Sequence, residues 1–208
     1  MIVTVNLSNG AIAMSKKKVI VKRLNSIQNF GAMDVLCSDK TGTITQGKVV
    51  LEKYLNPRGE ESDQVLEYAY VNSYYQTGLK NVMDFAILEH KEFNRSSIIS
   101  GKFQKIDEIP FDFERRRMSV VVEDQQGHHL LICKGAIEEV MSLCTRVELD
   151  GQSLPILSEH DAHRLERIKQ LNQQGYRVIA LAYKEMPGDI GQTTYSVKDE
   201  SDMVLLGF

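Results

Sequence analysis

The pattern of hydrophobic and polar positions predicts three β-strands in the middle of the chain. They cover residues 103–109, 117–123 and 129–134. The last two flank Asp124-Gln125-Gln126-Gly127, a polar run with a glycine that is typical of a hairpin turn. We therefore predict antiparallel pairing here, with further strands at residues 177–183 and 204–208.

Segments with helical character lie between and before these strands. Ser62 is placed to cap a helix that reaches Gln76, before Gly78 ends it. A turn at residues 56–59 precedes this helix. Further helices are predicted at residues 81–91, 136–144 and 159–174, and Gly175 stops the last of them.

The first fifty residues have a different pattern. Helices are predicted at residues 11–18 and 24–30, with a short strand at 19–21 between them. Residues 34–37 are an apolar approach to a polar, glycine-containing loop, the pattern of a buried strand with functional residues at its carboxyl end. Residues 48–51 are another strand candidate.

This layout predicts two parts. Residues 1–50 form a short α/β stub, and residues 51–208 form a larger α+β domain, an antiparallel β-sheet flanked by helices. The terminal strand is expected to return towards the stub. Because the chain opens and stops in apolar runs, both ends are expected to be cut rather than natural.

Composition and charge exclude several classes of function. The 25 basic and 28 acidic residues give a net charge of -3, so the chain has no general affinity for nucleic acid or anionic membranes. It has no stretch of about 18 to 20 apolar residues that could span a bilayer, and we expect it to be soluble. Cys37, Cys133 and Cys144 are widely spaced, which favours a reducing, cytosolic compartment. The five histidines form no metal-binding pattern, so no structural metal is predicted.

Candidate chemistry is concentrated in the loop Cys37-Ser38-Asp39-Lys40-Thr41-Gly42-Thr43-Ile44-Thr45. A carboxylate such as that of Asp39 can attack the γ-phosphorus of ATP and form an acyl phosphate. Both reacting groups are anionic, so the attack needs a cation and hydroxyl or amide donors, which residues 40–45 offer. Taken alone, the same residues also fit a polar surface turn.

The nine residues resemble the CSDKTGTLT motif of the P-type ATPases, with Ile44 in place of the commoner leucine, a conservative change. The resemblance implies that Asp39 is the phosphorylated residue and that Thr41 supplies a backbone carbonyl to Mg²⁺, so that Asp39 and Thr41 contact the metal. It places Lys40 and Thr43 around the phosphate. It also implies that residues 1–50 are a membrane-proximal stalk and part of a haloacid-dehalogenase-like phosphorylation domain.

A haloacid-dehalogenase-like phosphatase is the alternative within the same superfamily. Its DxDx[TV] loop carries a second aspartate, two positions after the first, as the general acid. Thr41 stands at that position here. Without a proton donor, rapid hydrolysis of an aspartyl phosphate is disfavoured, so the loop favours a pump over a phosphatase.

Four further segments resemble the nucleotide-binding motifs of the same family, in the same order. In residues 111–120 the resemblance implies that Phe111 stacks on adenine, with Arg116 near the phosphates and Met118 beside them. Lys134-Gly135-Ala136 resembles the KGA motif, in which the lysine lines the pocket and the glycine permits close approach of the nucleotide. Arg177 matches an arginine that reaches the triphosphate, and Asp84 matches an acidic residue beside the adenine. Each residue also has a structural alternative: Phe111 in the core, the arginines on a solvated face, Arg177 as a strand-end surface charge.

Two stretches narrow the resemblance to the magnesium-transporting branch. They are the lead-in at residues 18–34 and residues 72–81. Ion selectivity itself belongs to membrane helices, so magnesium rests on resemblance and not on chemistry.

The resemblance implies an ATP-binding, cytosolic fragment of a pump that couples ATP hydrolysis to magnesium transport, with ATP and Mg²⁺ as cofactors. Its partners would be the membrane helices, the actuator domain and the rest of the phosphorylation domain, at the cytoplasmic face of the plasma (inner) membrane. The TGES and GDGxND segments of the family do not occur in the sequence, so the chain alone is expected not to turn over. A regulatory nucleotide-binding remnant without turnover is the other alternative.

Overall fold

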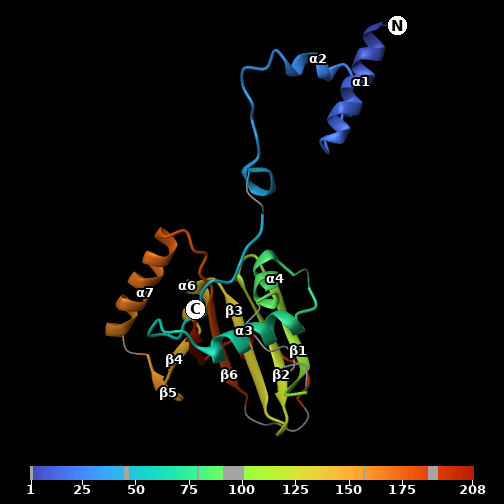
Figure 1. Ribbon diagram of the computed structural model, residues 1–208. Coiled ribbons are helices and arrows are strands. Elements are labelled where there is room, and N and C mark those ends of the chain that lie inside the picture. The colour runs from blue at the N-terminus through green and yellow to red at the C-terminus, as the bar shows by residue number, and fades with distance from the viewer. Residues whose placement is uncertain (1, 45–46, 79, 91–100, 157, 187–191) are drawn as a thin grey trace. The chain divides into compact units, whose positions relative to one another are not determined.

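Two units make up the chain, Met1–Lys48 and Val49–Phe208. The computed structural model describes every residue except 1, 45–46, 79, 91–100, 157 and 187–191 (Figure 1). The division lies two residues before the expected one at residue 50. Each unit is described here by itself.

A seven-stranded mixed sheet forms the centre of the second unit (Figure 1). In spatial order its strands are β1 (Phe103–Asp112), β2 (Arg117–Asp124), β3 (His129–Gly135), β6 (Ala180–Glu185), β7 (Met203–Gly207), β4 (Cys144–Leu149) and β5 (Gln152–Pro155). All neighbours are antiparallel except β4 and β7. The predicted antiparallel sheet is therefore confirmed for five of the six strand pairings, and it is mixed because the terminal strand inserts between β6 and β4 and runs in the direction of β4. Its predicted return towards the first unit stays a prediction.

The predicted strands β1, β2 and β3 are joined to one another by short turns. β1, β2 and β3 are confirmed, and the turn after Asp124 is closed by the amide of Gly127, which donates to the Asp124 carbonyl at 3.1 Å. The sixth strand begins at Ala180, so Arg177 precedes it rather than lying on it. The helix predicted at 136–144 is only α6 (Ile137–Met141), because Cys144 already opens β4. The sequence did not predict β4 or β5.

Each face of the sheet carries its own hydrophobic core. On one face, Leu130 and Ile132 of β3 pack with residues of α3 (Asp63–Tyr75) and α4 (Val82–Leu88). On the other face, Leu131 and Cys133 of the same strand pack with residues of α6 and α7 (Ser158–Gln173). Successive residues of a strand point to opposite faces, so an uninterrupted apolar strand such as β3 is buried on both sides.

The helices of this unit follow the predicted boundaries closely. Ser62 precedes α3 and Gln76 follows it, although the Ser62 side chain makes no capping hydrogen bond. Asn81 caps α4 and its side-chain oxygen accepts from the amides of Met83 and Asp84. Helix α4 ends at Leu88, and residue 91, the predicted end, lies outside the described residues. None of the described helices is long and apolar enough to cross a bilayer.

The first unit contains helices α1 (Ile2–Lys16) and α2 (Ser26–Phe30) and a π-helical turn, η1 (Lys40–Ile44). Helix α1 begins nine residues before its predicted start at residue 11. The strands predicted at 19–21, 34–37 and 48–51 were wrong, because none of these residues is in a strand and Leu36, in the second, is 78% exposed. A buried strand needs strand neighbours, and residues 2–44 supply none.

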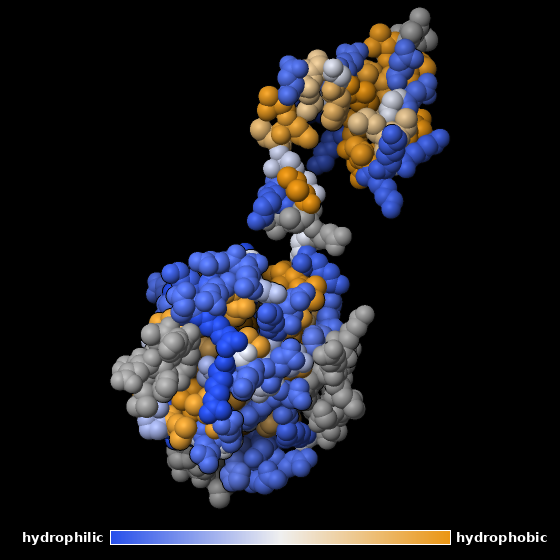
Figure 2. All heavy atoms as spheres, turned by 60° about the vertical axis from the view of Figure 1, so that its left-hand side comes forward, coloured by the Kyte–Doolittle hydropathy of each residue, from blue (hydrophilic) through white to orange (hydrophobic). Residues whose placement is uncertain are grey.

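The surfaces of the two units differ in hydropathy. In the view of Figure 2, hydrophobic side chains gather on the first unit, whereas the second unit is mostly hydrophilic. Val3, Ile12, Phe30 and Val35 of the first unit are each more than half exposed. The apolar positions of that unit are therefore not buried among the residues that the structure describes.

Candidate functional site

The segments that the sequence singled out for nucleotide binding lie together where strands β1, β2, β3 and β6 begin or end. This row across the strand ends forms one edge of the sheet. Across the strands, Asp112 is in register with Arg117, Arg117 with Gly135, and Gly135 with Ala180. This row joins the end of β1, the start of β2, the end of β3 and the start of β6. Phe111, Arg116, Lys134 and Arg177 each lie within three residues of it in the sequence, although they span 66 positions along the chain.

Lys134 is the most buried cation of this edge, and its side chain is 6% exposed. Its Nζ donates to the Asp84 carboxylate and, at 2.7 Å, to the Ser73 hydroxyl. Ser73 donates in turn to Asp84 at 3.2 Å, and the second carboxylate oxygen of Asp84 accepts from the Asn81 amide at 2.9 Å. The predicted pocket residues Asp84 and Lys134 are thus in direct contact, and Ser73, which the sequence did not single out, completes the cluster.

Burial has a clear effect on the charge of this cluster. Desolvation lowers the pKa of Lys134 below its ordinary value, while the neighbouring Asp84 carboxylate opposes that shift. A buried ammonium needs such a partner, since an unpaired charge in the interior is costly. Asp84 and Ser73 therefore hold the Lys134 side chain in place at this edge.

Gly135 is in close contact with the start of β2. A Cβ atom at this position would lie 2.5 Å from the Cβ of Arg117 and 2.6 Å from the carbonyl oxygen of Arg116. The glycine is thus required by the approach of two protein backbones. Its predicted contact with a nucleotide stays a prediction.

We expect Gly135→Ala to destabilise the chain by about 2 kcal/mol, because the added methyl group meets backbone rather than a side chain that could move aside. Urea denaturation measures the change. Gly78→Ala is the matched control, since no atom lies within 4 Å of its Cβ position, and its stability should change by less than about 0.5 kcal/mol. Equal stability of Gly135→Ala and the unsubstituted chain would contradict the contact.

Aromatic surface is exposed at the end of β1. Phe111 is 48% exposed and packs edge to face against Phe113, with ring centroids 5.3 Å apart. The structural alternative of Phe111 as a core residue is therefore wrong. Met118 differs, because it is buried in the core on the α3 and α4 face, in register with Lys134. Its predicted role beside the nucleotide stays a prediction.

The three consecutive arginines after β1 are engaged by acidic residues. Arg116 forms an ion pair with Glu139 of α6 at 2.6 Å, and its side chain is 54% exposed. Arg115 and Arg117 both pair with Glu200. Arg177 is exposed and forms no ion pair with the residues that the structure describes.

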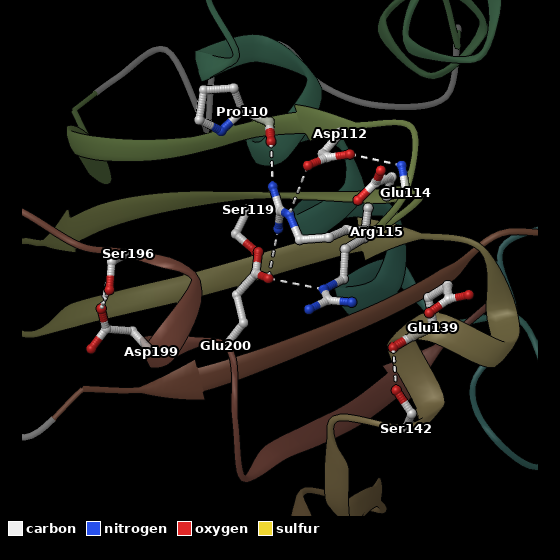
Figure 3. A network of polar contacts seen from close by, with 11 residues as sticks. Pro110, Asp112, Glu114, Arg115, Ser119, Glu139, Ser142, Ser196, Asp199 and Glu200 are labelled. Atoms are coloured by element: carbon white, nitrogen blue, oxygen red, sulfur yellow. Dashed lines mark hydrogen bonds and ion pairs between the residues drawn. The ribbon is translucent and has the colours of Figure 1, made fainter.

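Glu200 was missed by the sequence reasoning. Its side chain is fully buried, and its carboxylate accepts from Arg115 at 2.8 Å, from Arg117 at 2.9 Å and from the Ser119 hydroxyl at 2.7 Å. Figure 3 shows the guanidinium of Arg115 between the Glu200 carboxylate and the Pro110 carbonyl. No local pattern marks Glu200, because its partners lie more than 80 residues earlier in the chain.

The predicted phosphorylation loop lies in the first unit. Asp39 is exposed, and its backbone carbonyl accepts from the Ser38 hydroxyl at 3.2 Å. Lys40, Thr41 and Thr43 follow in η1, and Thr45 lies outside the described residues. The roles of these residues in phosphoryl transfer and metal binding stay predictions.

The cysteines differ in environment. Burial raises the pKa of both Cys133 and Cys144 to about 12, so these thiols stay protonated at neutral pH. Cys37 is exposed, which corrects its expected place in a buried strand. Among the residues that the structure describes, no group of histidine, cysteine and acidic side chains is placed to hold a metal ion.

Comparison with known proteins identifies the family. The model of the family described as "P-type ATPase, cytoplasmic domain N" matches residues 56–208. The chain belongs to the P-type ATPases. This membership confirms the family resemblance, and the mixed sheet with its helices is the cytoplasmic domain N of that family.

Individual relatives show which kinds of P-type ATPase the chain resembles. The chain is 51% identical over its whole length to the magnesium-transporting ATPase, P-type 1, of Salmonella typhimurium, and 50% identical to that of Escherichia coli. It is 29% identical to a calcium-transporting ATPase of Listeria monocytogenes, over 99% of the chain. The resemblance to the magnesium-transporting branch is thus confirmed. The chain spans about a quarter of the length of these relatives, 23% for the first two.

Proposed function

We propose that the chain is the ATP-binding part of a P-type ATPase that transports magnesium ions, with phosphoryl transfer to Asp39 as the coupling step. The register of the sheet edge is the observation that supports this best, since it gathers Phe111, Lys134 and Arg177 from separate segments. Magnesium rests on the higher identity to magnesium-transporting than to calcium-transporting relatives.

The side chains of this edge fit the chemistry of ATP. The half-exposed ring of Phe111 is available for stacking on a base, a contact that contributes about 1–3 kcal/mol. Arg177 and the exposed part of Arg116 offer guanidinium groups to phosphate oxygens. ATP supplies the phosphoryl group. Arg116 exchanges its bond to Glu139 for phosphate oxygens, and Arg177 holds the triphosphate in the same edge.

The loop around Asp39 fits the acceptor side of the reaction. Its exposed carboxylate acts as the nucleophile, and Lys40 and Thr43 stabilise negative charge beside it. Carboxylate and carbonyl oxygens, such as those of Asp39 and Thr41, are the ligands that Mg²⁺ prefers, and Mg²⁺ would neutralise the phosphate oxygens there. The Asp39 carboxylate attacks the γ-phosphorus of ATP, the bond from that phosphorus to the β–γ bridging oxygen breaks, and ADP leaves with that oxygen. The resulting acyl phosphate on Asp39 stores energy of ATP for transport.

Residues 1–50 would supply a stalk and part of a haloacid-dehalogenase-like phosphorylation domain, at the cytoplasmic face of the plasma membrane. Exposed apolar side chains such as Val35 and Leu36 suit contacts with the remaining strands of that domain. The membrane helices and the actuator domain would be the other partners. The chain alone is expected to bind ATP without turnover, because the TGES and GDGxND segments of the family are not in its sequence.

Titration of the isotopically labelled chain with ATP tests the pocket. We expect a dissociation constant of about 1 mM, since one stacked ring and a few solvated charge contacts leave roughly 4 kcal/mol after the cost of association. Amide shifts should cluster at Phe111, Lys134 and Arg177. Phe111→Ala should weaken binding about tenfold, whereas Phe30→Ala, which removes a similarly exposed ring from the first unit, should not. Shifts confined to other residues would rule out this pocket.

A further inference from the structure

The loop between β1 and β2 is held by one buried acidic side chain, that of Glu200. Glu200 follows η2 (Val197–Asp199) and precedes β7, far in sequence from the loop. Its Oε2 accepts from Arg115 and Arg117, at 2.8 and 2.9 Å, and its Oε1 accepts from Ser119 at 2.7 Å. Because the carboxylate is fully buried and the two arginine side chains are 17% and 11% exposed, solvent weakens these contacts little.

The backbone of this loop is tightly constrained. Arg116 has a φ of +46°, a conformation that non-glycine residues keep only where their surroundings enforce it. Its amide donates to the Asp112 carbonyl at 2.7 Å, and its carbonyl accepts from the Ala136 amide at 2.9 Å. The neighbours on both sides, Arg115 and Arg117, are those held by Glu200, and Figure 3 shows Arg115 reaching back to the Pro110 carbonyl as well. Glu200 thus restrains the β2 end of the loop directly, and Arg115 carries this restraint to Pro110 near the end of β1.

We propose that Glu200 is a positioning residue for nucleotide binding: through Arg115 and Arg117 it fixes the β1–β2 loop, and with it the ring of Phe111 and the guanidinium of Arg116. This inference rests on the proposed ATP pocket. Glu200 itself does not reach the nucleotide, because its side chain has no exposed surface. It also neutralises Arg117, and it pairs with Arg115 more closely than Asp112 does, at 2.8 Å against 3.7 Å.

Removal of the Glu200 carboxylate affects ATP binding in two opposing ways, through charge and through loop position, and the test separates them. Without the carboxylate, Arg115 and Arg117 carry free positive charge at the edge, and Asp112, 3.7 Å from Arg115, is the acidic group left near that side chain. If the added charge mattered more than loop position, ATP would bind more tightly. If position matters more, both ATP and adenosine lose affinity, since Arg115, which Glu200 holds, also donates to the Pro110 carbonyl directly before Phe111.

Glu200→Gln in the whole chain separates the two, with ATP and adenosine titrated against labelled protein. We expect the dissociation constant for ATP to rise about tenfold and that for adenosine to rise as well, with loss of the ligand-induced shifts at Phe111 and Arg116. Glu200→Asp keeps the charge but is one methylene shorter, so it should give an intermediate loss and partial recovery of those shifts. This second variant also serves if Glu200→Gln fails to fold.

Asp107→Asn is the matched control for a purely structural effect. Asp107 of β1 accepts from the amide of Tyr195 at 2.6 Å, so its replacement removes another acidic anchor between distant segments, away from the strand edge. It should lower the thermal unfolding midpoint without changing the ATP dissociation constant. Unchanged or tighter ATP binding by folded Glu200→Gln overturns the positioning role alone. Absence of ATP binding by the unsubstituted chain overturns the proposed pocket and this inference together.

Discussion

Asp39→Asn in the complete pump is expected to lower phosphoenzyme formation from ATP by at least about a thousandfold, because the amide is a far weaker nucleophile than the carboxylate it replaces. Asp39 is exposed and forms no side-chain hydrogen bond within the part of the chain that the structure describes. The substitution should therefore leave folding and ATP affinity unchanged. Incorporation of label from γ-labelled ATP into acid-quenched protein measures the effect.

Asp34→Asn is the matched control for this experiment. Asp34 is another exposed carboxylate of the first unit, five residues earlier and outside the motif, and its loss should leave labelling intact. Label that persists in Asp39→Asn would place the acceptor elsewhere. Label lost equally in both variants would indicate a general charge effect on the unit rather than a specific acceptor.

The strands that the sequence predicted are those whose own residues form a clear apolar pattern. Strands β1, β2 and β3 follow one another through short turns, so each strand and its partner lie close together in the sequence. β4 and β5 were missed although Asp150-Gly151, a typical hairpin turn, joins them, because both strands are short and only Val147 of the two is buried, so neither carries an apolar run. The strand predicted at residues 34–37 failed for the converse reason, since its apolar pattern has no strand partner among the described residues.

The residues of the candidate site also differ in whether a local sequence pattern marks them. Phe111, Lys134 and Arg177 could be found because each lies in a short motif with a chemical rationale, and the sheet register brings their segments together. Lys134 and Asp84 were each named from such a motif, and the fold brings the two side chains into contact. Glu200 could not be found, since a single glutamate in a loop carries no pattern until the fold places it under Arg115 and Arg117.

Four of the cations at this edge, unlike Arg177, are already paired with acidic residues that the structure describes. Arg116 has Glu139, Lys134 has Asp84, and Arg115 and Arg117 share Glu200. A triphosphate therefore competes with an internal carboxylate for Arg116 instead of meeting a free charge. This competition is consistent with the weak, roughly millimolar binding that we expect.

Lys134→Met is expected to destabilise the second unit by about 3–5 kcal/mol, because it leaves the fully buried carboxylate of Asp84 without its cation. Ser73 and the Asn81 amide still donate to Asp84, but neither carries a charge. The double variant Asp84→Asn/Lys134→Met removes both charges and should recover most of the loss. Urea denaturation of the single and double variants gives the coupling between the two residues.

Lys105→Met is the matched control, since the same substitution is made at a more exposed ion pair. Lys105 bonds Glu108 at 2.7 Å, and their side chains are 25% and 17% exposed. Partial hydration should limit its cost to about 1 kcal/mol or less. If Lys105→Met lowered the free energy of unfolding as much as Lys134→Met does, burial of the Lys134–Asp84 ion pair would not be the cause of the loss.

Asp84→Asn alone should make stability depend on pH through Lys134. Burial lowers the pKa of Lys134 in the folded chain, and the variant lacks the carboxylate that opposes this shift. Between that lowered pKa and the ordinary value of 10.5, the unfolded chain binds more protons than the folded one, so stability rises with pH in this window. The variant should therefore regain part of its lost stability as the pH rises from neutral towards 10.5, relative to the unsubstituted chain at the same pH values. A constant difference between the two proteins across this range would mean that Lys134 keeps its proton without Asp84, and that the hydroxyl of Ser73 is a sufficient partner.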